Sequence, residues 1–148
     1  MRVATKLYIA SCLKHRNTVE IVSECLLNNV DGIEIVSTWH KNAMSTVAVE
    51  RTLTQTEQEG IAMMCASEVR KADALIWIYG DNDGRTGAAI ECGIAIELGR
   101  HRPHSSMNIY ACPAPLATRS ELPLMLYSAE AWTHFDSIDV MLEELSRE

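Results

Sequence analysis

Apolar and polar positions follow two alternating patterns along this chain. Short runs rich in β-branched and aromatic residues predict strands, and the continuous apolar run 75–79 predicts a strand that is buried on both faces, as in a parallel sheet. Between them, apolar residues recur at every third or fourth position, which predicts amphipathic helices. The runs that predict strands are 6–10, 33–37, 75–79, 107–112 and 131–135, and the stretches that predict helices are 18–29, 54–71, 88–99 and 138–145.

Capping residues set the expected ends of these helices. Thr18 and Thr54 have side chains that commonly accept a hydrogen bond at a helix N-cap, and Glu57 would complete a capping box with Thr54. Gly99 is expected to end its helix as a C-cap. Residues 43–53 match neither pattern and could form a loop, a short helix or a lid over a site.

Strands that alternate with helices indicate an α/β fold. Right-handed crossovers between five such strands predict a flavodoxin-like, doubly wound sheet of five parallel strands in the order 2-1-3-4-5, with helices on both faces. A chain of 148 residues has the size of one domain, so residues 1–148 are expected to form a single domain. In this strand order, the loops after the first and third strands flank the crevice in which such folds bind ligands.

The charge balance limits the class of partner. The chain is acidic, with a formal charge of -7 from 13 Lys and Arg residues and 20 Asp and Glu residues. This argues against a nucleic-acid polymer, because binding to a phosphate backbone needs clustered positive charge. One or two local cations could still hold an individual nucleotide, so the expected partner is a small molecule.

Cysteine usage and hydropathy bear on the compartment. Five cysteines are scattered along the chain and form no C-x-x-C pair, which favours reduced thiols in the cytoplasm over a disulfide framework or a zinc site. The apolar run near the N-terminus, 7–10, is too short for a signal peptide, and no run has the length of a membrane span. The short apolar runs also argue against a membrane partner. The histidines show no ligand spacing with carboxylates, so no metal is expected, and no cofactor is expected either.

The residues with the most chemical potential lie between 72 and 100. The apolar run 75–79 is followed by a polar turn with a glycine at each end, 80–87, and then by a helix. Glu91 lies in the early turns of that helix, where the helix dipole and the free N–H groups are expected to keep it ionised at neutral pH. An ionised, partly buried carboxylate is a possible nucleophile, and Gly87 nearby would let a ligand approach the backbone closely. The alternative interpretation is an acid that only complements the helix dipole.

Small residues around the glutamate have a defined spacing, Gly87-x-x-x-Glu91-x-Gly93-x-Ala95-x-x-x-Gly99. This pattern, which follows an apolar strand, resembles that of the nucleoside 2-deoxyribosyltransferase family, which also includes deoxynucleoside 5'-monophosphate N-glycosidases. The resemblance implies that Glu91 is the nucleophile that attacks the anomeric carbon of the sugar. It also implies a homodimer or a larger homo-oligomer.

The implied reaction is cleavage of the N-glycosidic bond of 2'-deoxynucleosides or their 5'-monophosphates through a glycosyl ester on Glu91. The departing base needs a proton or a hydrogen bond, and Asp81 or Asp83 in the turn is the candidate acid, although such residues are also common in solvent-exposed turns. Tyr8 in the first strand is a possible partner that holds Glu91 in position. Transfer of the sugar to a second base would make the enzyme a transferase, and transfer to water would make it a hydrolase.

Candidate substrate-binding residues follow the first two strands. Ser11 and Arg16 correspond to the Ser and Arg with which relatives that act on monophosphates hold the phosphate. The planar guanidinium suits phosphate because it donates two hydrogen bonds at once, although both residues could also be ordinary loop residues. Trp39 could stack on a base or pack in the core, and His40 beside it is expected at the surface.

Several positions leave other functions open. Where family members often carry an acid six residues before the glutamate, this chain has Arg85. Relatives often place an acid late in the preceding helix to orient the sugar, in a region that Cys65 or Glu68 occupies here. One alternative is therefore a non-catalytic nucleotide sensor of the same fold. The other is a phosphoribohydrolase of the cytokinin-activating type, which also has a glycine four residues before a glutamate.

Overall fold

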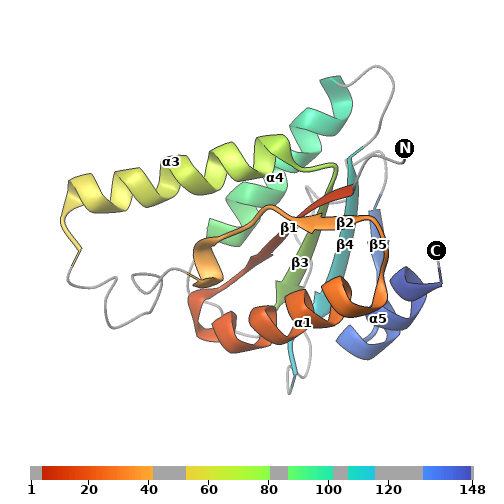
Figure 1. Ribbon diagram of the computed structural model, residues 1–148. Helices are drawn as coiled ribbons and strands as arrows, with labels where there is room; N and C mark the ends of the chain where they lie inside the picture. Colours follow the sequence, from red (N-terminus) through yellow and green to blue (C-terminus); the bar gives the residue numbers. More distant parts are fainter. Residues whose placement is uncertain (1–4, 42–52, 81–86, 102–106, 116–131, 148) are drawn as a thin grey trace.

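The computed structural model describes residues 5–41, 53–80, 87–101, 107–115 and 132–147 (Figure 1). Within these ranges, five strands form one parallel sheet in the order β2-β1-β3-β4-β5, which confirms the predicted flavodoxin-like α/β arrangement. The strands are β1 (Thr5–Ser11), β2 (Ile33–Ile35), β3 (Ala74–Tyr79), β4 (Asn108–Pro113) and β5 (Trp132–His134). The helices are α1 (Arg16–Asn29), α3 (Gln55–Lys71), α4 (Gly87–His101) and α5 (Ile138–Ser146), with the 3-10 turns η1 (Leu13–His15) and η2 (Trp39–Lys41).

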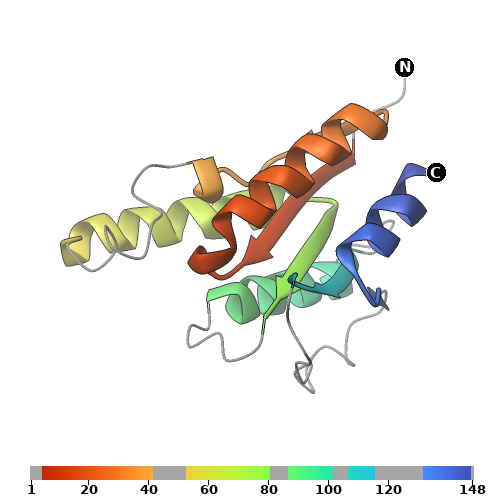
Figure 2. The same cartoon turned by 90° about the horizontal axis from the view of Figure 1, so that it is seen from below.

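Helices cover the sheet on both faces. α1 and α5 lie together on one face, and α3 and α4 lie together on the other, as Figures 1 and 2 show. Because successive side chains of a strand point to opposite faces, each strand contributes to both layers. Tyr8 of β1 reaches Glu91 of α4, whereas Cys112 of β4 contacts Met141 of α5. The candidate nucleophile therefore belongs to the α3–α4 layer.

The central strand β3 is the most enclosed part of the sheet. All six of its residues are buried, because β1 and β4 flank it and helices cover both of its faces. A strand in this position needs apolar side chains on both faces, which explains the continuous apolar run rather than an alternating pattern. Each fully buried Ile or Leu stabilises the fold by about 1.5–3 kcal/mol. α4, the next helix along the chain, packs against β3 and carries Glu91.

The two predicted N-caps have different outcomes. The Thr54 hydroxyl accepts a hydrogen bond from the Glu57 backbone N–H at 3.2 Å, and the Glu57 carboxylate accepts one from the Thr54 N–H at 3.2 Å, which confirms the capping box. The cap at Thr18 is wrong. α1 already begins at Arg16, and its N-cap residue, His15, makes no side-chain capping hydrogen bond. The 3-10 turn η1 brings the chain into helical geometry before Thr18 is reached.

Gly99 does not end its helix, as the C-cap prediction had it, because α4 continues to His101. The glycine instead faces the residue that precedes β4: a Cβ atom added at Gly99 would lie 3.3 Å from the Cβ atom of Met107. The absence of a side chain therefore lets α4 approach the sheet closely.

The second strand is shorter than the apolar run that predicted it, and it ends at Ile35. The chain continues beside β1, since the Val36 backbone N–H donates to the Leu7 carbonyl oxygen at 2.8 Å and the Ser37 hydroxyl accepts a hydrogen bond from the Ile9 backbone N–H at 3.1 Å. Most of 43–53, which matched no pattern, lies outside the described residues. Across the described ranges, no helix combines the length and apolar character needed to cross a membrane.

Candidate active site

Glu91 and Tyr8 form the centre of the site. Glu91 lies one turn into α4, and Tyr8 lies in the middle of β1, where its side chain is fully buried. The Tyr8 hydroxyl donates a hydrogen bond to the Oε2 atom of Glu91. The other carboxylate oxygen, Oε1, makes no hydrogen bond to the described part of the chain. One oxygen is thus held and the other is available to a ligand.

Burial governs the electrostatics of this pair. It raises the pKa of Glu91 to about 7; the hydrogen bond from Tyr8 acts in the opposite direction, and the negative charge of Glu68 adds to the increase. The expectation that the helix dipole keeps Glu91 ionised is therefore too simple, because a carboxyl group with this pKa is about half protonated at neutral pH. Burial and then the charge of Glu91 raise the pKa of Tyr8, so Tyr8 remains a hydrogen-bond donor.

Two residues of α3 complete the surroundings of Tyr8 and Glu91. The Cys65 thiol lies against the Tyr8 hydroxyl. Burial, followed by the charge of Glu91, raises the pKa of Cys65 to about 11, so it stays a neutral thiol. Glu68 accepts hydrogen bonds from the Thr38 backbone N–H at 3.1 Å and from the Thr38 hydroxyl at 2.7 Å. Of the two positions that could replace the acid of the resembling family, Cys65 therefore adjoins Tyr8, whereas Glu68 is bound to the segment after β2.

The two candidate phosphate ligands lie at and just after the carboxyl end of β1. The Ser11 hydroxyl donates a hydrogen bond to the Ile78 carbonyl oxygen at 2.7 Å, which joins the ends of β1 and β3. Arg16, the first residue of α1, donates from Nε to the His40 carbonyl oxygen at 2.5 Å. Its two terminal nitrogens make no hydrogen bond or ion pair within the described ranges. Arg16 thus has two donor groups to offer an anion.

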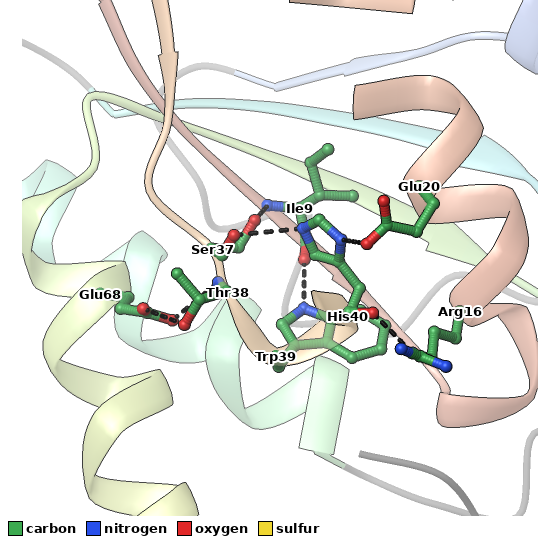
Figure 3. A network of polar contacts seen from close by, with 8 residues as sticks. All are labelled: Ile9, Arg16, Glu20, Ser37, Thr38, Trp39, His40 and Glu68. Carbon is green, nitrogen blue, oxygen red and sulfur yellow. Dashed lines mark hydrogen bonds and ion pairs between the residues drawn. The ribbon is translucent and has the colours of Figure 1, made fainter. Parts of the chain in front are cut away.

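Figure 3 shows the polar contacts of the segment after β2, in which Trp39 and His40 are both buried. Trp39 is only 5% exposed, and its ring N–H donates to the Ile9 carbonyl oxygen at 2.8 Å. This placement matches the core interpretation and leaves no free ring face on which a base could stack. His40 is completely buried instead of lying at the surface. Its Nδ1 atom lies 2.8 Å from Oε1 of Glu20, and its Nε2 atom lies 3.1 Å from the Ser37 carbonyl oxygen.

The remaining candidates belong to the turn before α4. Asp81 and Asp83, the candidate acids, lie outside the described residues, and so does Arg85. Gly87 is the first residue of α4, one helical turn before Glu91. The predicted catalytic set is thus brought together only in part, as the contact of Tyr8 with Glu91.

One further polar pair was not anticipated. The Tyr79 hydroxyl lies 2.6 Å from Nε2 of His134, and the two rings are stacked with their centres 5.8 Å apart. Tyr79 ends β3 and His134 ends β5, so the two residues meet across β4. Nothing in the sequence pattern distinguished them, because both belong to short runs that predicted only buried strands.

Comparison with known proteins adds no assignment: no protein-family model matches this chain, and no curated protein matches its sequence. Among the described residues, no three His, Cys, Asp or Glu side chains gather as metal ligands.

Proposed function

We propose that the protein cleaves the N-glycosidic bond of 2'-deoxynucleosides or their 5'-monophosphates through a glycosyl-enzyme intermediate on Glu91. The observation that carries this proposal is the partly buried Glu91 carboxyl group, which Tyr8 holds by one oxygen while the other remains without a described partner. A carboxylate that is oriented by a donor and poorly hydrated is well suited to attack carbon. Its place on the helix after the central strand is where such folds bind ligands.

In the proposed reaction, ionised Glu91 attacks the anomeric carbon with Oε1. The carbon–nitrogen bond to the base breaks as the ester bond forms, and the electron pair of that bond leaves with the base. Asp81 or Asp83 is the proposed acid that supplies a proton to the base. A second base or a water molecule then attacks the same carbon and gives its proton to the Asp that protonated the first base. The ester bond breaks, Glu91 is released as a carboxylate, and the outcome is transfer or hydrolysis respectively.

Arg16 and Ser11 are the proposed contacts of a 5'-phosphate. The terminal nitrogens of Arg16 support this role, because a guanidinium edge can donate two hydrogen bonds to one phosphate. Ser11 would contribute by turning its O–H group from the Ile78 carbonyl oxygen to the phosphate, because phosphate oxygens accept hydrogen bonds. By the same resemblance we propose a homo-oligomer, which sedimentation measurements would test. The five free thiols fit a reducing compartment such as the cytoplasm.

A second function is favoured by one observation. Next to Tyr8 and Glu91 the chain has the neutral thiol of Cys65, where an acid is common in the resembling enzymes. A site that binds a nucleotide without cleaving it would tolerate this replacement. A non-catalytic nucleotide sensor is therefore the alternative.

The decisive experiment is chromatographic detection of free base. Wild-type protein and Glu91→Gln are incubated with deoxynucleosides and deoxynucleoside 5'-monophosphates, each with and without a second base. We expect release by the wild type and a loss of at least about a thousandfold in Glu91→Gln, because a nucleophile is removed while its shape is kept. Glu97→Gln, an exposed position on the same helix, is the control and should behave as wild type. Nucleotide binding by the wild type without release of any base would favour the sensor instead.

A further inference from the structure

Helix α1 holds His40 at two points, as Figure 3 shows. The Nε group of Arg16 donates to the His40 backbone carbonyl at 2.5 Å, and the Glu20 carboxylate lies 2.8 Å from Nδ1 of the ring. Arg16 and Glu20 are four residues apart on α1 and thus share one face of the helix. A single buried residue from another segment therefore lies between a cation and an anion of the same helix.

Contacts of the His40 ring and of the residue beside it hold His40 in place. Its ring is completely buried and places Nε2 3.1 Å from the Ser37 carbonyl oxygen. The neighbouring residue Trp39 is bound to Ile9 of β1 by its ring N–H. The η2 turn is thereby attached to the central sheet, and so is the carbonyl group that receives Arg16. Both nitrogens of the ring face oxygen atoms, so both belong to contacts within the protein.

The arrangement prevents a common ion pair. Arg and Glu side chains four residues apart on a helix ordinarily attract each other, and Glu20 is 32% exposed and could move. Instead, its carboxylate is bound to His40, and no ion pair joins it to Arg16 in the described structure. Within the part of the chain that the structure describes, the terminal nitrogens of Arg16 consequently keep no partner, while its Nε group is held by the His40 carbonyl oxygen.

We propose that His40 is a positioning residue that keeps Arg16 available to a phosphate group by binding Glu20. The inference rests on the proposed function in one respect, the assignment of Arg16 to the 5'-phosphate. When His40 is present, the carboxylate is occupied, and the terminal nitrogens of Arg16 have no acidic partner among the described residues. When the ring is lost, Glu20 is released and neutralises Arg16. His40 thus determines selectivity for phosphorylated substrates without touching them.

Two substitutions of His40 separate this role from general support of the fold. In His40→Gln, the amide nitrogen occupies the place of Nε2, so the contact with Ser37 is kept and the contact with Glu20 is lost. In His40→Asn, the amide nitrogen occupies the place of Nδ1, so the contact with Glu20 is kept. Calorimetric titration with inorganic phosphate and with deoxynucleoside 5'-monophosphates then compares these variants with the wild type.

We expect His40→Gln to weaken phosphate binding about tenfold, because the freed Glu20 would compete with the phosphate for one charge-assisted hydrogen bond from Arg16. His40→Asn should stay within about threefold of the wild type, and the double variant His40→Gln with Glu20→Gln should recover most of the lost affinity. With substrates, His40→Gln should raise KM for the monophosphates and leave kcat and the unphosphorylated nucleosides unchanged. Wild-type affinity in His40→Gln, or no recovery in the folded double variant, would overturn the proposal.

Glu20→Gln provides a test that does not depend on a buried substitution. Because Glu20 is already occupied by His40, its neutralisation should change phosphate affinity by less than about threefold. A larger gain in affinity would mean that Glu20 pairs with Arg16 in the wild type and would contradict the inference.

Cleavage of unphosphorylated nucleosides without any phosphate binding by the wild type would overturn this inference alone. Phosphate binding with the expected variant pattern but no cleavage would overturn only the proposed chemistry.

Discussion

At the scale of single residues, two opposed effects act on Glu91. Removal from water raises its pKa to about 7, and the O–H group of Tyr8 favours the ionised form. Near neutral pH the carboxyl group therefore exists in both forms. Its ionised form is less hydrated than an exposed glutamate and thus a better nucleophile. The hydrogen bond from Tyr8 increases the share of this form.

Replacement of Tyr8 by Phe should reveal this effect. Without the hydrogen bond, the ionised carboxylate is less stable, so the pKa of Glu91 should rise further above 7. Because the proposed attack needs the ionised form, the acid side of the pH–rate profile should move to higher pH by about one unit, and base release at neutral pH should fall about tenfold or more. Tyr110→Phe, which changes a tyrosine of β4, is the matched control. Identical pH profiles for Tyr8→Phe and wild type would refute the assigned role.

At the scale of elements, sequence patterns predicted a strand or a helix correctly where the interactions that form it lie within one segment. The run 75–79 predicted β3 because a strand covered on both faces must be apolar on both. Thr54 predicted the start of α3 because the capping hydrogen bonds lie within four residues. The start of α1 and the role of Gly99 escaped prediction, since they depend on a 3-10 turn and on contact with Met107. Such contacts are made only when separate segments pack together.

Two glycines of α4 should respond differently to alanine. At Gly93, no atom lies within 4 Å of an added Cβ, so Gly93→Ala should stabilise the protein by about 0.5–1 kcal/mol through a smaller loss of backbone entropy. At Gly99, the added Cβ would lie 3.3 Å from the Cβ of Met107. Gly99→Ala should therefore be less stable than Gly93→Ala by about 1–2 kcal/mol. Urea denaturation measures both, and equal gains would show that the packing of Gly99 is not tight.

At the scale of the whole molecule, the strand order brings together residues that are distant in the chain. Tyr8 and Glu91 are 83 positions apart, yet both could be named from the sequence, because the first and third strands are neighbours in a 2-1-3-4-5 sheet. The protonation of Glu91 and the burial of His40 could not. Both depend on how much water the surrounding elements exclude. The protonation of Glu91 also depends on Glu68 of α3, which comes near Glu91 only when the chain folds.

The same burial should give the stability of the whole molecule a distinct pH dependence. Glu91 has a pKa of about 7 in the folded protein, raised from 4.5. Between these values the folded state holds a proton that the unfolded state has released. The stabilisation linked to this proton is therefore complete below about pH 4.5 and is lost as pH rises through about 7. The loss should amount to at most roughly 3 kcal/mol, and Glu91→Gln should lack it, since an amide does not titrate.

Urea denaturation of both proteins between about pH 5 and 8 measures the difference in their free energies of unfolding. As pH rises, the free energy of unfolding of the wild type should fall relative to that of Glu91→Gln, because the other groups titrate alike in both proteins. A difference that does not vary with pH would mean that the Glu91 carboxyl group is ionised throughout, as the helix dipole alone would suggest.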